Sequence, residues 1–102
     1  MAAFDSVAIA SGTGDVQAVA AGKFLRLIGF SVGEDAGTAA AAEIKIFNGT
    51  STGGEVVVPA CNLAADGFGT FWYGPDGIPC ANGIYLNRVT GTTEVVIYYS
   101  NV

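Results

Sequence analysis

Short apolar runs separated by glycine-rich turn signals constrain the fold of this sequence more than any other feature. Clusters such as 11–14, 48–54 and 74–77 recur at the spacing of about eight to twelve residues that is typical of antiparallel β-sandwiches and barrels. No stretch shows a sustained helical period. We therefore predict a single all-β domain over residues 1–102, an antiparallel, jelly-roll-like β-sandwich of about eight strands. The predicted strands are residues 4–10, 15–21, 24–32, 43–47, 55–63, 69–73, 78–89 with a break at 82–83, and 94–100.

Several segments carry more specific expectations. Residues 1–10 form either an amino-terminal arm or an edge strand. Pro59 lacks a backbone N–H, so residues 55–63 should form an edge strand or contain a bulge. The alanines at 39–42 lead straight into an alternating strand and are predicted to be extended. The predicted inward face of residues 24–32 consists of Phe24, Arg26, Ile28, Phe30 and Val32.

The composition predicts an interface. Hydrophobic residues make up 51% of the chain, whereas charged residues make up only 13%. A chain of this length hides roughly two-thirds of its extended surface, so part of the apolar supply must lie outside. Because exposed apolar surface of this kind is usually a contact surface, we expect a homo-oligomer or a subunit of a larger assembly.

The charge balance argues against nucleic acid as a partner. The net charge is −5, and the only cations are the scattered Lys23, Arg26, Lys45 and Arg88, which form no phosphate-binding cluster. The amino terminus lacks a basic region of the signal-peptide type, and the longest apolar run, 56–65, is too short to cross a bilayer. We expect a soluble, non-exported protein without a membrane partner.

The sequence offers little chemistry. It contains no histidine, which excludes Ser-His-Asp and Cys-His catalysis. The two cysteines, Cys61 and Cys80, are too few for a zinc site, and free thiols are favoured over a disulfide. We therefore expect no enzyme activity, no cofactor and no metal. One alternative is a carboxylate pair among loop residues, although these acids more simply solvate their loops; the candidates are Glu34, Asp35, Asp66 and Asp76.

An aromatic group is the most informative local feature. In Phe71-Trp72-Tyr73 consecutive side chains point to opposite faces of a strand, so all of them cannot enter one core. Either the outward residues make a subunit contact, or a loop or the amino-terminal arm covers them within the chain. A stacking platform for sugars is a third use. The predicted interface residues are Phe4, Phe68, Phe71, Trp72 and Tyr73.

Residues 16–99 resemble a group of small β-sandwich virion proteins of tailed phages. The matching segments, in order, are residues 21–27 (AGKFLRL), a small-residue loop, 43–49 (EIKIFNG), 72–75 (WYGP), 82–86 (NGIYL), Gly91 and 95–99 (VVIYY). The resemblance implies a capsid decoration or cement protein, made in the host cytoplasm, that sits on the outside of the virion head.

The same resemblance implies the partners. They are the major capsid protein, whose shell the protein would stabilise, and further copies of itself in a homotrimer. Residues 2–10 and 34–38 are then candidate capsid contacts, and the aromatic strand is a candidate trimer contact. The alternative is a receptor- or carbohydrate-binding tip module of a phage tail fibre, which would use the same fold.

Overall fold

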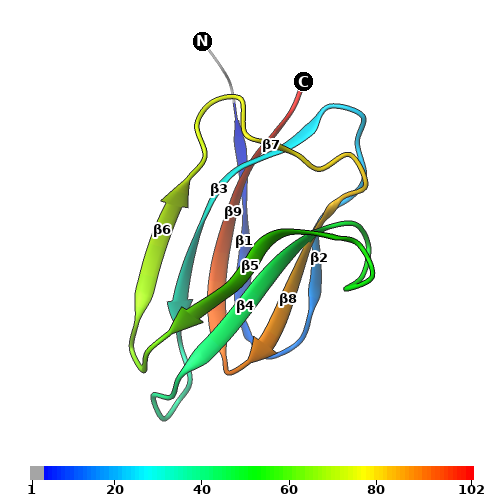
Figure 1. The fold of residues 1–102 in the computed structure, drawn as a ribbon. Helices are drawn as coiled ribbons and strands as arrows, with labels where there is room; N and C mark the ends of the chain where they lie inside the picture. Colours follow the sequence, from blue (N-terminus) through cyan, green and yellow to red (C-terminus); the bar gives the residue numbers. More distant parts are fainter. Residues whose placement is uncertain (1–3) are drawn as a thin grey trace.

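The computed structural model describes residues 4–102, and these residues form only strands and loops (Figure 1). The strands of this range are β1 (Asp5–Gly12), β2 (Val16–Val19), β3 (Leu25–Glu34), β4 (Ala42–Asn48), β5 (Glu55–Leu63), β6 (Phe68–Trp72), β7 (Ile78–Pro79), β8 (Ile84–Thr90) and β9 (Thr93–Asn101). Every predicted strand is present. The count rises to nine because the predicted break near residues 82–83 separates β7 from β8. The first three residues of the predicted amino-terminal arm lie outside the described range.

The strands form two antiparallel sheets that pack face to face (Figure 1). Sheet A has the order β1-β9-β3-β6, with β7 also beside β3, and sheet B has the order β2-β8-β4-β5. The pairing is nested: β4 pairs with β5, β3 with β6, β2 with β8 and β1 with β9. One long antiparallel hairpin that is folded over and rolled up produces this nesting, and the β3–β9 and β4–β8 pairs close the roll. The predicted jelly-roll β-sandwich is therefore confirmed.

The core lies between the sheets and follows the alternation of the strands. Isoleucine, leucine and valine side chains from both inner faces interdigitate there, as expected for two packed sheets. Fully buried members include Leu25, Leu27 and Phe30 of β3, Ile44 and Ile46 of β4, Ile84 and Leu86 of β8, and Val95 and Ile97 of β9.

The predicted inward face of β3 is wrong in its first half. Leu25 and Leu27 point into the core, whereas Phe24 is 55% exposed. The register of β3 against β9 shifts between Leu27 and Gly29, which inserts one extra residue and reverses the alternation. Ile28 is buried as predicted, at 1% exposure, although it lies outside the central cluster, and from Phe30 onward the predicted phase is correct.

The expectations for Pro59, for the alanine segment and for the cysteines can be compared with the structure. Strand β5 is an edge strand, and it is bulged because its register against β4 shifts around Pro59. Of the alanines at 39–42, only Ala42 lies in a strand, and the space beside it is so narrow that a Cβ on Gly91 would lie 2.7 Å from the Ala42 Cβ. Both cysteines are free thiols, with Cys80 buried and Cys61 half-buried. No helix of residues 4–102 has the length and hydropathy needed to span a membrane.

Candidate functional site

The outward side of sheet A collects most of the predicted interface residues. The register places small residues of β3 opposite large ones of β6: Gly33 stands opposite Phe68, and Gly29 stands opposite Trp72. Residues directly opposite one another project from the same face of a sheet, and the same rule extends this surface to β9. We call this surface the aromatic face; it consists of Phe4, Ser31, Phe68, Thr70, Trp72, Glu94, Val96 and Tyr98.

Phe4 and Trp72 meet on this face although they lie far apart in the sequence. Their ring centroids are 5.5 Å apart in an edge-to-face arrangement, and Phe4 packs in the same way on Tyr98 at 6.2 Å. Gly29 makes room for this cluster, because any Cβ there would approach the Trp72 ring and the Phe71 carbonyl oxygen too closely. The rings remain accessible: Phe4 is 52% exposed and Trp72 is 54% exposed.

A row of hydroxyl groups crosses the aromatic face beside these rings. The Ser31 hydroxyl lies 2.9 Å from the Thr70 hydroxyl and 3.2 Å from the Tyr98 hydroxyl, so it links β6, β3 and β9. These two hydrogen bonds use two of the three O–H donors, so one hydroxyl of the row keeps a donor for solvent or a partner. The row carries no cation.

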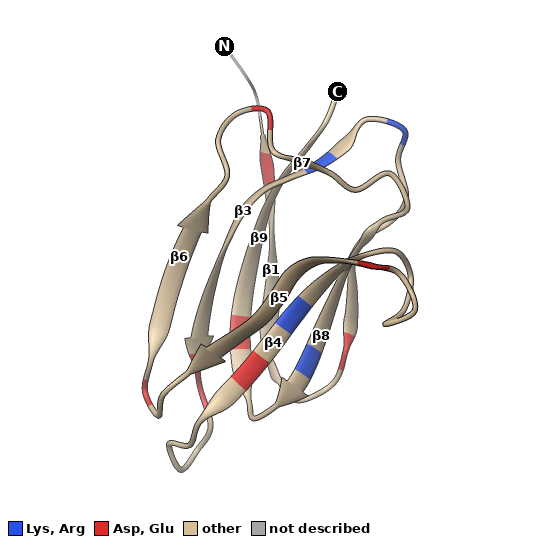
Figure 2. Ribbon diagram, in the orientation of Figure 1, with Lys and Arg blue, Asp and Glu red and all other residues tan. Residues whose placement is uncertain are grey.

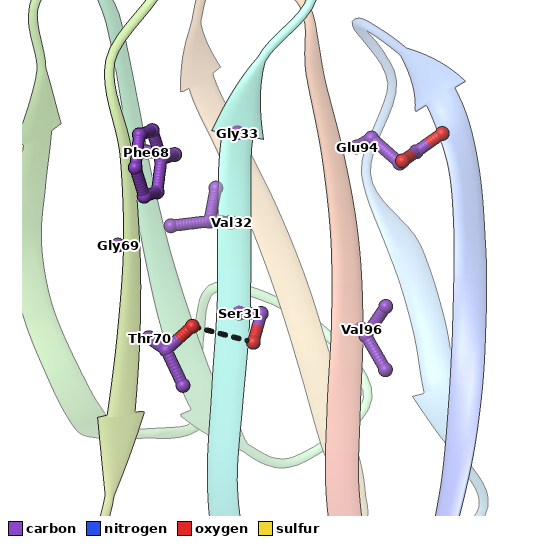
Figure 3. A pocket seen from close by; sticks show the side chains of 8 residues that line it. All are labelled: Ser31, Val32, Gly33, Phe68, Gly69, Thr70, Glu94 and Val96. Atoms are coloured by element: carbon purple, nitrogen blue, oxygen red, sulfur yellow. Dashed lines mark hydrogen bonds between the residues drawn. The ribbon is translucent and has the colours of Figure 1, made fainter.

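A shallow groove lies between Phe68 of β6 and the outward residues of β3 and β9. Its volume is about 210 Å³, and Gly33, which stands opposite Phe68, leaves part of its floor without a side chain. The Phe68 ring, 85% exposed, stands along one side (Figure 3). On the other side Val96 and Glu94 line the groove, but the Glu94 carboxylate turns away from Phe68 toward β1 (Figure 3). The groove thus fits an apolar side chain better than a charged group.

Phe71 and Tyr73 lie on the other side of the same segment. The Phe71 ring stacks on the core residue Phe30 with centroids 4.9 Å apart, and Tyr73 packs on the same ring at 6.4 Å. With β5 they line a cleft of about 340 Å³ at the open edge of the sandwich, between β5 and β6. Burial raises the pKa of the Cys61 thiol in this cleft, so the thiol is protonated at neutral pH and is a weak nucleophile.

The sequence therefore predicted the interface residues as one group, whereas the structure divides them. Phe4, Phe68 and Trp72 belong to the aromatic face, while Phe71 and Tyr73 line the cleft on the inner side. The amino-terminal segment covers Trp72 only in part. Intramolecular cover thus applies to part of the aromatic strand, and a subunit contact at the exposed part stays a prediction.

Charged residues lie mainly away from the aromatic face (Figure 2). Glu94 is the one charged residue among those that define the face. Lys45 and Arg88 belong to sheet B. Arg26 lies further along β3, where its Nη1 donates to the carbonyl oxygen of Asp76 at 3.1 Å. The face is therefore suited to contacts driven by apolar burial rather than by charge.

Glu34, one of the candidates for a carboxylate pair, is engaged by backbone groups. Glu34 is 9% exposed, and its carboxylate accepts hydrogen bonds from the backbone N–H of Asp66 at 2.7 Å and of Ala36 at 2.6 Å. These bonds lower the pKa of Glu34 and keep it ionised. Its role is to join the loop after β3 to the turn before β6. Asp76 lies in the turn that Arg26 contacts, at the opposite end of β3.

Arg88 is a buried residue that sequence reasoning missed. It is 8% exposed, and its guanidinium donates to carbonyl oxygens of Ala10, Gly14 and Thr93 and to the Thr93 hydroxyl. It joins the end of β1 to β8 and β9. Its partners include the carbonyl groups of Ala10 and Gly14, which are remote in the sequence, so no local pattern reveals them.

Asp15 lies at the same end of the sandwich as Arg88 and contacts its backbone. Its carboxylate accepts hydrogen bonds from the Tyr85 hydroxyl, the Asn87 side chain and the Arg88 backbone N–H. It thereby fixes the start of β2 against β8. These groups are structural in character, because they satisfy one another.

No set of three or more metal-ligating side chains gathers within residues 4–102. Comparison with protein-family models gave no match, and comparisons with curated proteins and with solved structures found no significant similarity. The interpretation of the site therefore depends on its geometry and on the sequence features given above.

Proposed function

We propose that this chain is a structural component of a tailed-phage virion, a capsid decoration protein that binds the outside of the head and stabilises the shell of the major capsid protein. The observation that carries the proposal is the aromatic face, on which large apolar side chains are exposed together. Phe68 is 85% exposed and Trp72 is 54% exposed, which is costly for a protein that stays free in water. A protein-bound state removes this surface from water.

The physical properties of the face support protein contacts. Its groove takes apolar groups, its hydroxyls are hydrogen-bonded to one another along the row, and a single charge lies on it. A decoration protein binds a shell at many equivalent places, so modest contacts suffice when they are repeated. The absence of histidine and the buried roles of Glu34 and Arg88 agree with a protein that performs no catalysis.

The test uses heads of the phage that encodes this chain, stripped of it or assembled without it. The chain has one tryptophan, so the fluorescence of Trp72 reports directly on the aromatic face during titration with heads. We expect Phe68→Ser to weaken head binding about tenfold or more, as for a central interface aromatic. The control is Val89→Ser, because Val89 is also exposed, at 41%, but lies on β8 of sheet B. Head binding by F68S that equals that of V89S would contradict the proposal.

A receptor- or carbohydrate-binding tip of a tail fibre is the second candidate. The observation in its favour is the accessible Trp72 ring beside the hydroxyls of Thr70 and Ser31, because sugars combine stacking with hydrogen bonds. Host surface polysaccharide would then change Trp72 fluorescence saturably, and Thr70→Val would weaken that response. Saturable polysaccharide binding with no binding to heads would replace the first proposal with this one.

A further inference from the structure

Strand β6 is an unprotected sheet edge. It pairs with β3 on one side and forms the margin of sheet A on the other, at the left of the molecule in Figure 1. Its sequence, FGTFW, contains no charge and no proline. Natural sheets guard exposed edges with charges, prolines, bulges or side-chain cover, since free N–H and C=O groups there pair with other strands.

The other edges of the described sheets carry such protection. Strand β5 contains Pro59 and register shifts. Strand β2 is only four residues long, and the Gln17 side chain donates to the Val19 carbonyl at its end. Strand β1 has a register shift, and the Arg88 guanidinium donates a hydrogen bond to the carbonyl oxygen of Ala10. Within residues 4–102, β6 alone lacks a device of these kinds.

The free main-chain groups of β6 follow from its pairing with β3. The Gly67 carbonyl accepts from Glu34 and the Tyr73 N–H donates to Ile28, so the odd-numbered residues of this segment face β3. In an antiparallel strand the alternate residues direct both their N–H and their C=O to the other side. Those residues are Phe68, Thr70 and Trp72, and Thr70 stands at the middle of the strand.

We propose that β6 pairs in antiparallel register with β6 of a second copy of this chain, around a two-fold axis at Thr70. Thr70 then faces Thr70 of the other copy, and Phe68 faces Trp72 of the other copy in each direction. Every outward N–H and C=O of the three residues finds a partner. Thr–Thr and aromatic–aromatic pairs are favourable cross-strand neighbours, and no like charges are opposed.

The exposed area sets the size of such a dimer interface. The exposed fractions are 85% for Phe68, 54% for Trp72 and 41% for Phe71, with 39% for Tyr73 nearby. With aromatic side chains of 150–250 Å², these fractions leave about 440 Å² per copy, hence about 900 Å² for two copies before the backbone is counted. The paired backbone adds to that total, which places the dimer near the lower limit of specific interfaces.

A second copy fits this edge better than three-fold association through strand pairing. A ring of three copies would need β6 to pair with a different edge of its neighbour, and the other edges are protected. Pairing of β6 with itself needs only one surface and closes as a dimer. The inference goes beyond the proposed function and does not depend on a phage role, since its test uses the protein alone.

The experiment compares three Thr70 variants of the full chain by light-scattering mass over a range of concentrations. Thr70→Pro removes the central outward N–H and Thr70→Lys places two cations at the axis, so both should be monomeric. Thr70→Val keeps the N–H while removing the hydroxyl that contacts Ser31, so it should remain dimeric like the parent chain. Circular dichroism checks that each variant is folded, and T70K keeps the test valid if T70P unfolds.

Two NMR readouts locate the contact. The amides of Phe68, Thr70 and Trp72 should be protected from hydrogen exchange in the dimer and exchange quickly in T70K. A mixed labelled sample should show an intermolecular contact between the Hα atoms of Gly69 and Phe71, which face each other in this register. A monomer at all concentrations, a trimeric mass, or a dimer in which these amides stay unprotected would overturn the proposal.

Discussion

Arg88→Met is the substitution whose cost follows most directly from the structure. The Arg88 side chain makes hydrogen bonds to Thr93 Oγ1 (3.1 Å), to the Thr93 carbonyl (2.8 Å), to the Ala10 carbonyl (2.7 Å) and to the Gly14 carbonyl (3.2 Å). Methionine keeps an apolar stem of similar length and removes every donor. Four acceptors from three chain segments therefore lose their partner at once.

The accessibility of these acceptors sets the magnitude. Thr93 is 0% exposed, so its carbonyl and hydroxyl cannot turn to water, and each unpaired buried group costs about 1–3 kcal/mol. Ala10 and Gly14 are exposed, so water replaces the guanidinium at their carbonyls at little cost. Burial of the cation, which lowers the pKa of Arg88, offsets part of the loss. We expect R88M to lower the free energy of unfolding by about 2–4 kcal/mol.

Equilibrium unfolding in urea, followed by Trp72 fluorescence, measures this cost. Lys45→Met is the matched control, because Lys45 is a half-buried cation of the adjacent strand β4 and makes no side-chain hydrogen bond within residues 4–102. The control should change stability by no more than about 0.5 kcal/mol. The free energies of unfolding of R88M and K45M should depend on urea concentration with the same slope. If these free energies then differ by less than about 1 kcal/mol, Arg88 does not hold this end of the sandwich together.

Two further predictions address the loops and the site. Gly29→Ala should destabilise the fold by about 1–3 kcal/mol, because the added methyl group collides with the Phe71 carbonyl oxygen; Gly37→Ala, in open space, is the control, and equal unfolding midpoints would refute the packing argument. Glu34 has a lowered pKa in the folded state, so its ionisation stabilises the fold above its ordinary value of 4.5, and that contribution is lost as the pH falls through the lowered value. Glu34→Gln should therefore be less stable than the parent chain at pH 7, and the difference should shrink toward pH 3 in thermal unfolding; a difference independent of pH would show that the charge is unimportant.

The strands and the sandwich could be predicted from the sequence because both depend on local signals. Turn residues mark the ends of strands, and strand β5 coincides with its prediction at both ends. The phase of β3 could not be predicted in full, since the bulge before Gly29 arises from pairing with β9 and contact with Trp72. Alternation alone assigns Phe24 to the core, whereas the bulge places Leu25 there.

The candidate site, too, could be predicted from the sequence only where it depends on local signals. The alternation within Phe71-Trp72-Tyr73 already required one aromatic side to leave the core. Which side does so depends on the β3–β6 register, and the register places Trp72 outward beside Gly29. The contact between Phe4 and Trp72 and the burial of Arg88 join segments that are remote in the sequence. Such contacts require the folded topology.

The proposed dimer changes how a weakened head interaction should be interpreted. Two-fold pairing of β6 would join two aromatic faces and place Phe68 and Trp72 of opposite copies against each other, in the middle of the joined surface. Phe4, Val96 and Tyr98 would remain further out on each copy and stay available to a capsid. A Phe68→Ser chain that stays dimeric and binds heads poorly would identify Phe68 as a direct capsid contact. A chain that loses both properties would show that Phe68 acts through the dimer, with the joined surface as the unit that the shell binds.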